Sequence, residues 1–92
     1  MKTDVIFRKW KNNEVIAIFP EIPFKQKNPS TCMSYQKIGQ HGEYALACRD
    51  ITKLATEQEY QSLKKELETI GYKFNVISKA TRKHFNQRNT TF

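Results

Sequence analysis

The stretch DVIFRKWKNNEVIAIFP, from Asp4 to Pro20, decides the fold. It contains two runs of β-branched and aromatic residues, which are typical of strands. Asn12 and Asn13 lie between the runs, and asparagine tolerates the positive φ angles that tight hairpin turns require. The stretch therefore predicts an antiparallel hairpin with a two-residue turn, in which Trp10 pairs with Val15.

Both predicted strands carry apolar side chains in both alternating phases. In the first strand, for example, Ile6 lies between Val5 and Phe7. This pattern is typical of central strands that are covered on both faces, at least in part. One helix covers only one face of a sheet, so something else must cover the second face. The candidates are the proline-rich connection at residues 20–30, the C-terminal segment, a second copy of the chain and a partner protein.

A second hairpin is predicted from TCMSYQKI, residues 31–38, and EYALACRDI, residues 43–51. The two runs are joined through Gly39-Gln40-His41-Gly42, which supplies the conformational freedom of a turn. A loop symmetric about its two central residues brings apolar side chains opposite apolar side chains, as register selection requires. This register pairs Tyr35 with Leu46, Met33 with Cys48 and Lys37 with Tyr44.

A helix is predicted after the second hairpin. Thr56-Glu57-Gln58-Glu59 matches a capping box, in which Thr56 accepts from the backbone of Glu59 while Glu59 reaches back. Gly71 supplies the left-handed stop at the C-terminal end. The apolar residues between these two signals follow helical spacing and form one stripe. That stripe consists of Tyr60, Leu63, Leu67 and Ile70.

The stretch from Tyr72 to Ile77 alternates as a fifth strand with a half-buried face. The predicted fold is therefore α+β, with the order β-β-β-β-α-β. It is a mainly antiparallel sheet of about five strands with one amphipathic helix packed on one face. We expect residues 1–79 to form a single α+β domain and residues 80–92 to form a basic C-terminal tail or a short helix.

Composition limits the classes of function. The chain has 92 residues, 38% of them hydrophobic and 27% charged, which is typical of a small soluble globular domain. No apolar run approaches the ~18 residues that a membrane span requires, so we expect a cytoplasmic protein without membrane contact. The formal net charge of +7 favours polyanionic partners by general electrostatics.

Metal and catalytic sites have little support. The soft or borderline ligands are Cys32, His41, Cys48 and His84, and no two have the close spacing of structural zinc sites. The predicted register sends the two cysteines to opposite faces, which excludes a disulfide. His41 and Cys48 lie about 20 Å apart along an extended strand, too far for a nucleophile and its base. Two other catalytic pairs, Cys32 with His84 and His41 with Glu43, remain geometrically possible, but no sequence motif supports either. We expect no metal, no cofactor and no enzymatic activity.

A basic and aromatic pattern favours a nucleic-acid ligand. Arg8-Lys9-Trp10-Lys11 places an aromatic ring among three cations beside a hairpin turn, a combination that single-stranded nucleic acid uses for stacking and phosphate contact. The chain has no acidic residue after Glu68, so positive charge gathers in the C-terminal segment as well. The leading hypothesis is a small non-enzymatic protein that binds single-stranded nucleic acid. The residues expected to contact it are Arg8, Lys9, Trp10, Lys11, Arg82, Lys83 and Arg88.

Other interpretations of the same residues stay open. Trp10 beside the turn also fits a side chain that shields the end of the core, and a basic C-terminal segment also fits a solvated chain end. The uncovered second face of the predicted sheet indicates, as an alternative function, a protein-interaction or homodimerisation module. A sheet-and-helix dimer that binds single strands would combine both hypotheses.

Four stretches carry a resemblance to known sequences: VIFRKWKNNEVIAIFP, YQKIGQHGEYALA, TEQEYQSLKKEL and GYKF. They resemble a group of small uncharacterised proteins encoded by gut anaerobic bacteria and by their phages or other mobile elements. The resemblance covers most of the chain, from about Val5 to Phe74. It implies a bacterial cytosolic setting and a mobile-element role, and it carries over no functional residue.

Overall fold

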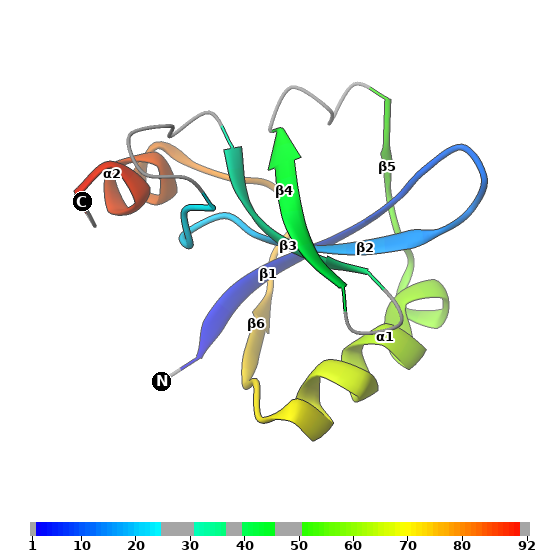
Figure 1. Cartoon of the computed structure of the whole chain (residues 1–92). Helices are drawn as coiled ribbons and strands as arrows, with labels where there is room; N and C mark the ends of the chain where they lie inside the picture. Colours follow the sequence, from blue (N-terminus) through cyan, green and yellow to red (C-terminus); the bar gives the residue numbers. More distant parts are fainter. Residues whose placement is uncertain (1, 25–30, 37–39, 46–50, 91–92) are drawn as a thin grey trace.

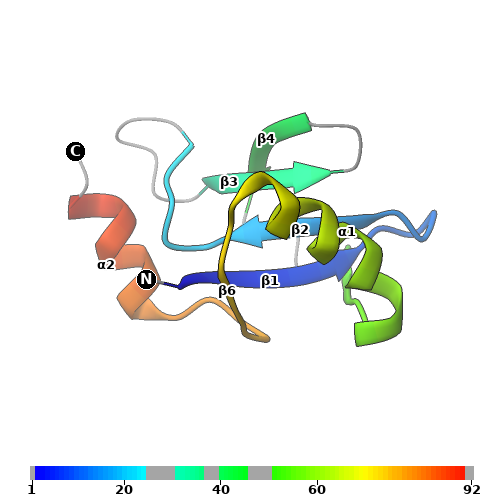
Figure 2. The same ribbon diagram turned by 90° about the horizontal axis from the view of Figure 1, so that it is seen from below.

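The computed structural model describes residues 2–24, 31–36, 40–45 and 51–90. Within these ranges the chain folds as an α+β protein with a mainly antiparallel sheet, as the sequence predicts, and α1 packs across one face of that sheet (Figures 1 and 2). The elements in chain order are β1 (Thr3–Lys9), β2 (Val15–Phe19), β3 (Thr31–Gln36), β4 (Gln40–Ala45), β5 (Lys53–Leu54), α1 (Glu57–Ile70), β6 (Phe74–Val76) and α2 (Arg82–Thr90).

Strand β1 organises the sheet. The strand order is β4-β3-β2-β1-β5, and β6 also pairs with β1. The short β5 pairs antiparallel with β1 at Arg8 and Lys9, whereas β6 runs parallel to β1 and starts opposite Thr3. The two short strands therefore share one edge of β1, one at each end. The chain reaches β6 from β5 through α1, so the parallel pair β1–β6 joins two strands that are separated along the chain by the other strands and this helix.

The first hairpin forms where the sequence predicts it, but in a different register. Lys9 pairs with Val15, and the Trp10 N–H donates to the Glu14 carbonyl at 2.9 Å, so Trp10 lies opposite Glu14 and not opposite Val15. Three residues close the turn, and the last of them, Asn13, has a φ of 69°. Three-residue hairpin loops that end on a left-handed residue are common, and asparagine fits that position.

The register predicted for the second hairpin is wrong. Tyr35 pairs with His41 and not with Leu46, because β4 already begins at Gln40. Gly42 is therefore a strand residue opposite Ser34, whose hydroxyl donates to the Gly42 carbonyl at 3.0 Å. The other observed pairs include Cys32 with Tyr44 and Met33 with Glu43, in place of Met33 with Cys48 and Lys37 with Tyr44.

An odd shift in register moves every side chain of a strand to the other face. Tyr44 consequently lies on the face opposite Tyr35, where it is buried beside Cys32. Its hydroxyl lies 3.1 Å from the Thr52 hydroxyl, a partner that the predicted register did not provide. Cys48 lies outside the described residues, so the exclusion of a disulfide between Cys32 and Cys48 stays a prediction.

The sheet is buried on both faces. On the first face α1 completes a cluster that contains Val5, Phe7, Ala17, Phe19, Tyr35, Leu63 and Leu67. On the second face lies a cluster of Ile6, Ile16, Ile18, Cys32 and Tyr44, with Trp10, Ile77 and Ala80 packed against it. Of the candidates for covering the second face, the C-terminal segment of residues 80–92 thus supplies Ala80, whereas Ile77 comes from the predicted fifth strand and Trp10 from the first hairpin.

The helix signals are confirmed, with one exception in the apolar stripe. The Thr56 hydroxyl accepts from the Glu59 N–H and the Glu59 carboxylate accepts from the Thr56 N–H, which completes the capping box. Ile70, however, is 56% exposed. Gly71, with a φ of 121°, turns the chain so that Tyr72 stacks on Phe19 with ring centroids 5.4 Å apart. Tyr72 therefore packs against the core where the stripe predicted Ile70.

Candidate nucleic-acid interface

The residues predicted to bind nucleic acid form two groups at opposite ends of the molecule. Arg8 to Lys11 belong to the β1–β2 hairpin end, and Arg82, Lys83 and Arg88 belong to α2 (Figures 1 and 2). Asp4 contacts α2, and Trp10 lies six residues further along the chain, which is about 20 Å of extended backbone. The structure therefore does not gather the predicted residues into one surface.

Arg8 is held by the fold. Its Nε donates to the Thr52 hydroxyl at 2.7 Å, and a terminal nitrogen donates to the Thr52 carbonyl at 2.8 Å. The Tyr44 hydroxyl meets the same Thr52 hydroxyl, and Thr52 is only 5% exposed. Arg8 and Tyr44 thus fix the backbone that enters β5, and Arg8 acts as a positioning residue for this end of the molecule.

Lys9 is matched by an acidic side chain of α1. Its ammonium group lies 2.5 Å from a carboxylate oxygen of Glu59. The hydrogen bond from Lys9, together with the backbone N–H of Thr56, lowers the pKa of Glu59 from 4.5 to about 2. The carboxylate therefore stays ionised in neutral solution and offsets most of the charge that Lys9 would offer to a phosphate.

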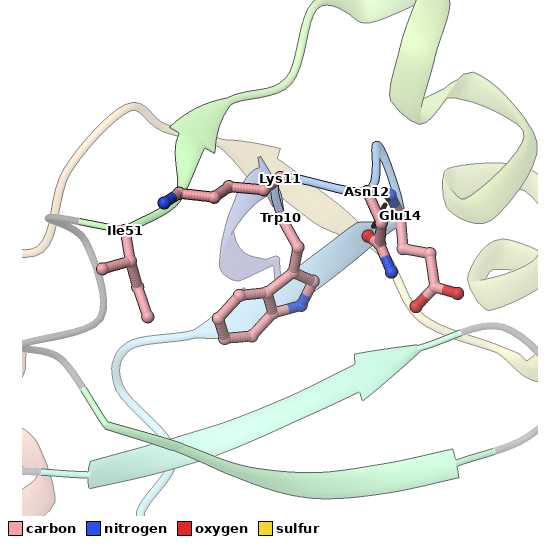
Figure 3. Close-up of a pocket in the computed structure, with 5 residues that line it drawn as sticks. All are labelled: Trp10, Lys11, Asn12, Glu14 and Ile51. Carbon is pink, nitrogen blue, oxygen red and sulfur yellow. Dashed lines mark hydrogen bonds between the residues drawn. The ribbon is translucent and has the colours of Figure 1, made fainter.

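Trp10 lines an open hollow while part of its ring packs on the core. Its ring centroid lies 6.1 Å from that of Tyr44, with the two planes tilted by 56°. The hollow has a volume of about 550 Å³ and is lined by Trp10, Lys11, Asn12, Glu14 and Ile51 (Figure 3). The Trp10 side chain therefore shields part of the core and also presents an accessible aromatic face in the hollow.

The residues that line this hollow are apolar at one end and polar at the other. Figure 3 shows Ile51 beyond the six-membered ring of the indole, and the polar groups of Asn12 and Glu14 on the side of the indole nitrogen. The Lys11 side chain extends above the ring towards Ile51. An apolar end and an acidic, amide-bearing end thus flank one aromatic ring.

A second hollow, of about 300 Å³, adjoins the first. The two share Trp10, Lys11 and Ile51, and the second adds Lys9, Asn13, Thr52 and Lys53. Lys11 and Lys53 are exposed, and they come from different strand ends that the β1–β5 pairing brings together. The ring of Trp10 therefore lines both hollows, beside Lys11 in each and beside Lys9 and Lys53 in the second.

The sequence pattern missed the residues that β5 and the segment before it contribute. Ile51 ends a predicted strand, Thr52 and Lys53 follow it, and nothing in the sequence placed them beside Trp10. The only local signal is the short alternation in ITKL, which is typical of a strand but too brief to indicate its partner. Lys53 reaches the site because it pairs with Lys9 in the sheet.

The other basic group surrounds a buried histidine. Arg82 and Lys83 are exposed in the first turn of α2, Arg88 belongs to the same helix, and His84 is buried. The His84 Nε2 lies 2.8 Å from an Asp4 oxygen, and the Thr81 N–H donates to its Nδ1 at 3.0 Å. Both ring nitrogens are thus engaged within the protein, so this imidazole is not presented to a substrate or a metal.

Asp4 is the hub of that contact. The hydrogen bond from His84, and a second one from the Asn75 amide at 3.0 Å, lower the pKa of the Asp4 carboxyl. Asp4 thereby joins β1, β6 and α2. Within the part of the chain that the structure describes, no group of His, Cys, Asp and Glu side chains is arranged to hold a metal ion.

Comparison of the chain with models of protein families, with curated proteins and with solved structures finds no significant match. Among the described helices, none has the length and apolar character needed to cross a membrane.

Proposed function

We propose that this chain is a small non-enzymatic binding protein whose ligand is single-stranded nucleic acid, bound at the hairpin end with a base on Trp10. One observation carries the proposal: two adjoining hollows share the Trp10 ring and Lys11, and the second is also lined by Lys9 and Lys53. Single-stranded nucleic acid has a matching division, because each nucleotide joins a flat base to a charged phosphate.

The expected contacts follow from that division. A base stacked on an aromatic side chain contributes about 1–3 kcal/mol, and stacking tolerates any base because each has a π-face. Lys11 and Lys53 are exposed and can contact the phosphates on either side of the stacked base. The net charge of +7 adds a general attraction for the strand.

The proposed site is smaller than the seven residues that the sequence suggested. Trp10 and Lys11 remain, Lys53 joins them, and Arg8 and Lys9 act through their contacts with Thr52 and Glu59. Arg82, Lys83 and Arg88 lie at the far end of β1 and take no part in binding a short oligonucleotide. This restriction distinguishes the proposal from attraction by net charge alone.

The first test uses the fluorescence of Trp10, the only tryptophan of the chain. A short oligothymidine titrated into the protein should quench that fluorescence. If two phosphates are contacted, affinity should fall about sevenfold between about 50 mM and about 200 mM salt. The absence of any fluorescence change and of any binding at the lower salt concentration would overturn the proposal.

The second test compares variants by the anisotropy of a labelled oligonucleotide. Trp10→Ala should weaken binding at least about fivefold, because it removes the stacking surface. Lys53→Gln should weaken it and reduce the salt slope by about one phosphate contact. Arg82→Gln removes the same charge from α2 and is the matched control. Equal losses for Lys53→Gln and Arg82→Gln would point to non-specific attraction and refute the proposed site.

The alternative function, a protein-interaction or homodimerisation module, stays a prediction. It rested on an uncovered second sheet face, and the cluster on that face is now seen to be packed by Trp10, Ile77 and Ala80. That observation no longer favours it. Sedimentation analysis of the protein tests it directly: a monomer at micromolar concentration would remove self-association from consideration. A bacterial, mobile-element setting is likewise a proposal, based on the sequence resemblance alone, and a cytoplasmic location is a proposal that also rests on the lack of a long apolar run in the sequence.

A further inference from the structure

We infer that the Trp10 hollow selects guanine over the other bases, through the Glu14 carboxylate and the Asn12 amide. The inference rests on the proposed function, because it assigns base specificity to the same site. Its basis is the polar end of the hollow, where these two side chains lie on the side of the indole nitrogen (Figure 3).

The hairpin turn fixes the Asn12 side chain and the Glu14 backbone relative to Trp10. The Glu14 carbonyl accepts from the Trp10 N–H at 2.9 Å, and the Glu14 N–H donates to the Asn12 Oδ1 at 3.0 Å. Because the Asn12 oxygen is bonded to the backbone, the two donors of its Nδ2 group point away from that bond. The turn therefore presents amide donors beside a carboxylate at one side of the aromatic ring.

This arrangement matches one base edge. The Watson–Crick edge of guanine has an acceptor, O6, followed by two parallel donors, N1–H and N2–H. A carboxylate accepts two parallel donors with its two oxygens, and such charge-assisted bidentate pairs are the stronger class of hydrogen bond. The Asn12 Nδ2 group supplies the donor that O6 needs. Stacked on Trp10, guanine would thus satisfy both side chains.

The other bases leave the carboxylate unsatisfied. Adenine and cytosine have one amino donor next to a ring-nitrogen acceptor, and uracil and thymine have one N–H between two carbonyl oxygens. Each of them brings an acceptor towards the second oxygen of Glu14, which is repulsive. Selection against these bases therefore comes from the mismatch as well as from the guanine contact itself.

The distribution of charge suits this orientation. Glu14 lines only the first hollow, and Lys53 lines only the second. A nucleotide with its base edge at Glu14 places its phosphate away from the carboxylate, towards Lys11 and Lys53. The Glu14 carboxylate then faces the hydrogen-bond donors of the base. Its repulsion of the phosphate is reduced, because the phosphate lies farther away.

The test compares short oligothymidines that differ only in one central base: guanine, adenine, cytosine or thymine. The protein should bind the guanine strand at least about fivefold more tightly than each of the others. Glu14→Gln keeps one acceptor but replaces the other with an amino group, so the preference should disappear while binding of oligothymidine persists. Glu68→Gln removes the same charge from the exposed end of α1 and should keep the preference.

The outcomes separate the two proposals. Equal binding of all four strands would overturn guanine selection and leave stacking on Trp10 intact. A guanine preference that survives in Glu14→Gln would overturn the role of Glu14. Failure of every strand to bind at about 50 mM salt would overturn the proposed function itself, and with it this inference.

Discussion

The Nε2 atom of His84 lies 2.8 Å from the Oδ2 atom of Asp4, although the two residues are 80 positions apart in the chain. This contact joins α2 to β1. At its other ring nitrogen His84 accepts from the Thr81 N–H, which is the place that glutamate takes in a capping box. One imidazole therefore caps the start of α2 and anchors the helix to the sheet.

Removal of that imidazole should destabilise the protein. We expect His84→Leu to lower the free energy of unfolding by about 2 kcal/mol, because a buried hydrogen bond to a charged group and the helix cap are both lost. Urea denaturation followed by circular dichroism measures the change. Lys83→Gln alters the exposed neighbour and should change stability by less than about 0.5 kcal/mol. If the two variants are equally stable, the contact does not anchor α2.

The two lowered carboxyl pKa values predict a loss of stability in acid. A carboxyl whose pKa is lower in the folded than in the unfolded state contributes stability above its unfolded pKa, and this contribution disappears as the pH falls through the folded pKa. The pKa of Glu59 falls to about 2 beside Lys9, and that of Asp4 is lowered chiefly by His84. Stability should therefore decrease from about pH 4.5 down to about pH 2.

Urea midpoints measured across this pH range test the assignment. Glu59→Gln removes the titrating group beside Lys9, so its stability should decline less steeply in acid than that of the unaltered protein. Glu68→Gln removes a carboxyl from the same helix without touching Lys9 and is the control. Identical acid profiles for Glu59→Gln and the unaltered protein would show that the Lys9 pair contributes nothing to the pH dependence.

Local signals predicted much of the fold. The capping box at Thr56 and the asparagine turn each depend on residues within a few positions of one another, so sequence spacing alone is informative. The register of the second hairpin was not predictable in this way. Both the symmetric loop and the observed one bury apolar residues, and the observed register places Tyr44 against Thr52, in a segment that the pattern did not place.

Only some residues of the candidate site could be predicted from the sequence. Trp10 and Lys11 stand out because an aromatic residue beside cations at a turn is a local pattern. Ile51 and Lys53 join them through a two-residue strand, and two residues give too little periodicity to indicate a partner. The contact between Asp4 and His84 has no local signal at all, because the fold alone brings its ends together.

Thr52 should matter for the shape of the hollow although it is buried. Thr52→Val keeps the side-chain volume but leaves the Arg8 Nε and the Tyr44 hydroxyl without this partner, so we expect a loss of about 1–2 kcal/mol in the free energy of unfolding. Acrylamide quenching of Trp10 fluorescence should change as well, because the segment beside the ring shifts.

The matched control is Thr69→Val. The Thr69 hydroxyl donates only within α1, to the Lys65 carbonyl at 2.9 Å, and the side chain is exposed. This variant should leave the quenching of Trp10 unchanged. If Thr52→Val also leaves it unchanged, the hydrogen bonds to Thr52 do not position the hollow.

Asn13 offers a test of the turn that carries Trp10 and Glu14. Its φ of 69° lies in the left-handed region. Most residues with a Cβ atom are strained there, whereas asparagine is tolerated better than most. We expect Asn13→Ala to lower the free energy of unfolding by about 1 kcal/mol, and Asn13→Gly to be neutral or slightly stabilising. Thermal and urea denaturation distinguish the two. Equal destabilisation by the two variants would mean that the side chain of Asn13, which both remove, and not its backbone angle, holds the turn. Base selectivity should then fall in both variants, since Glu14 depends on that turn for its position.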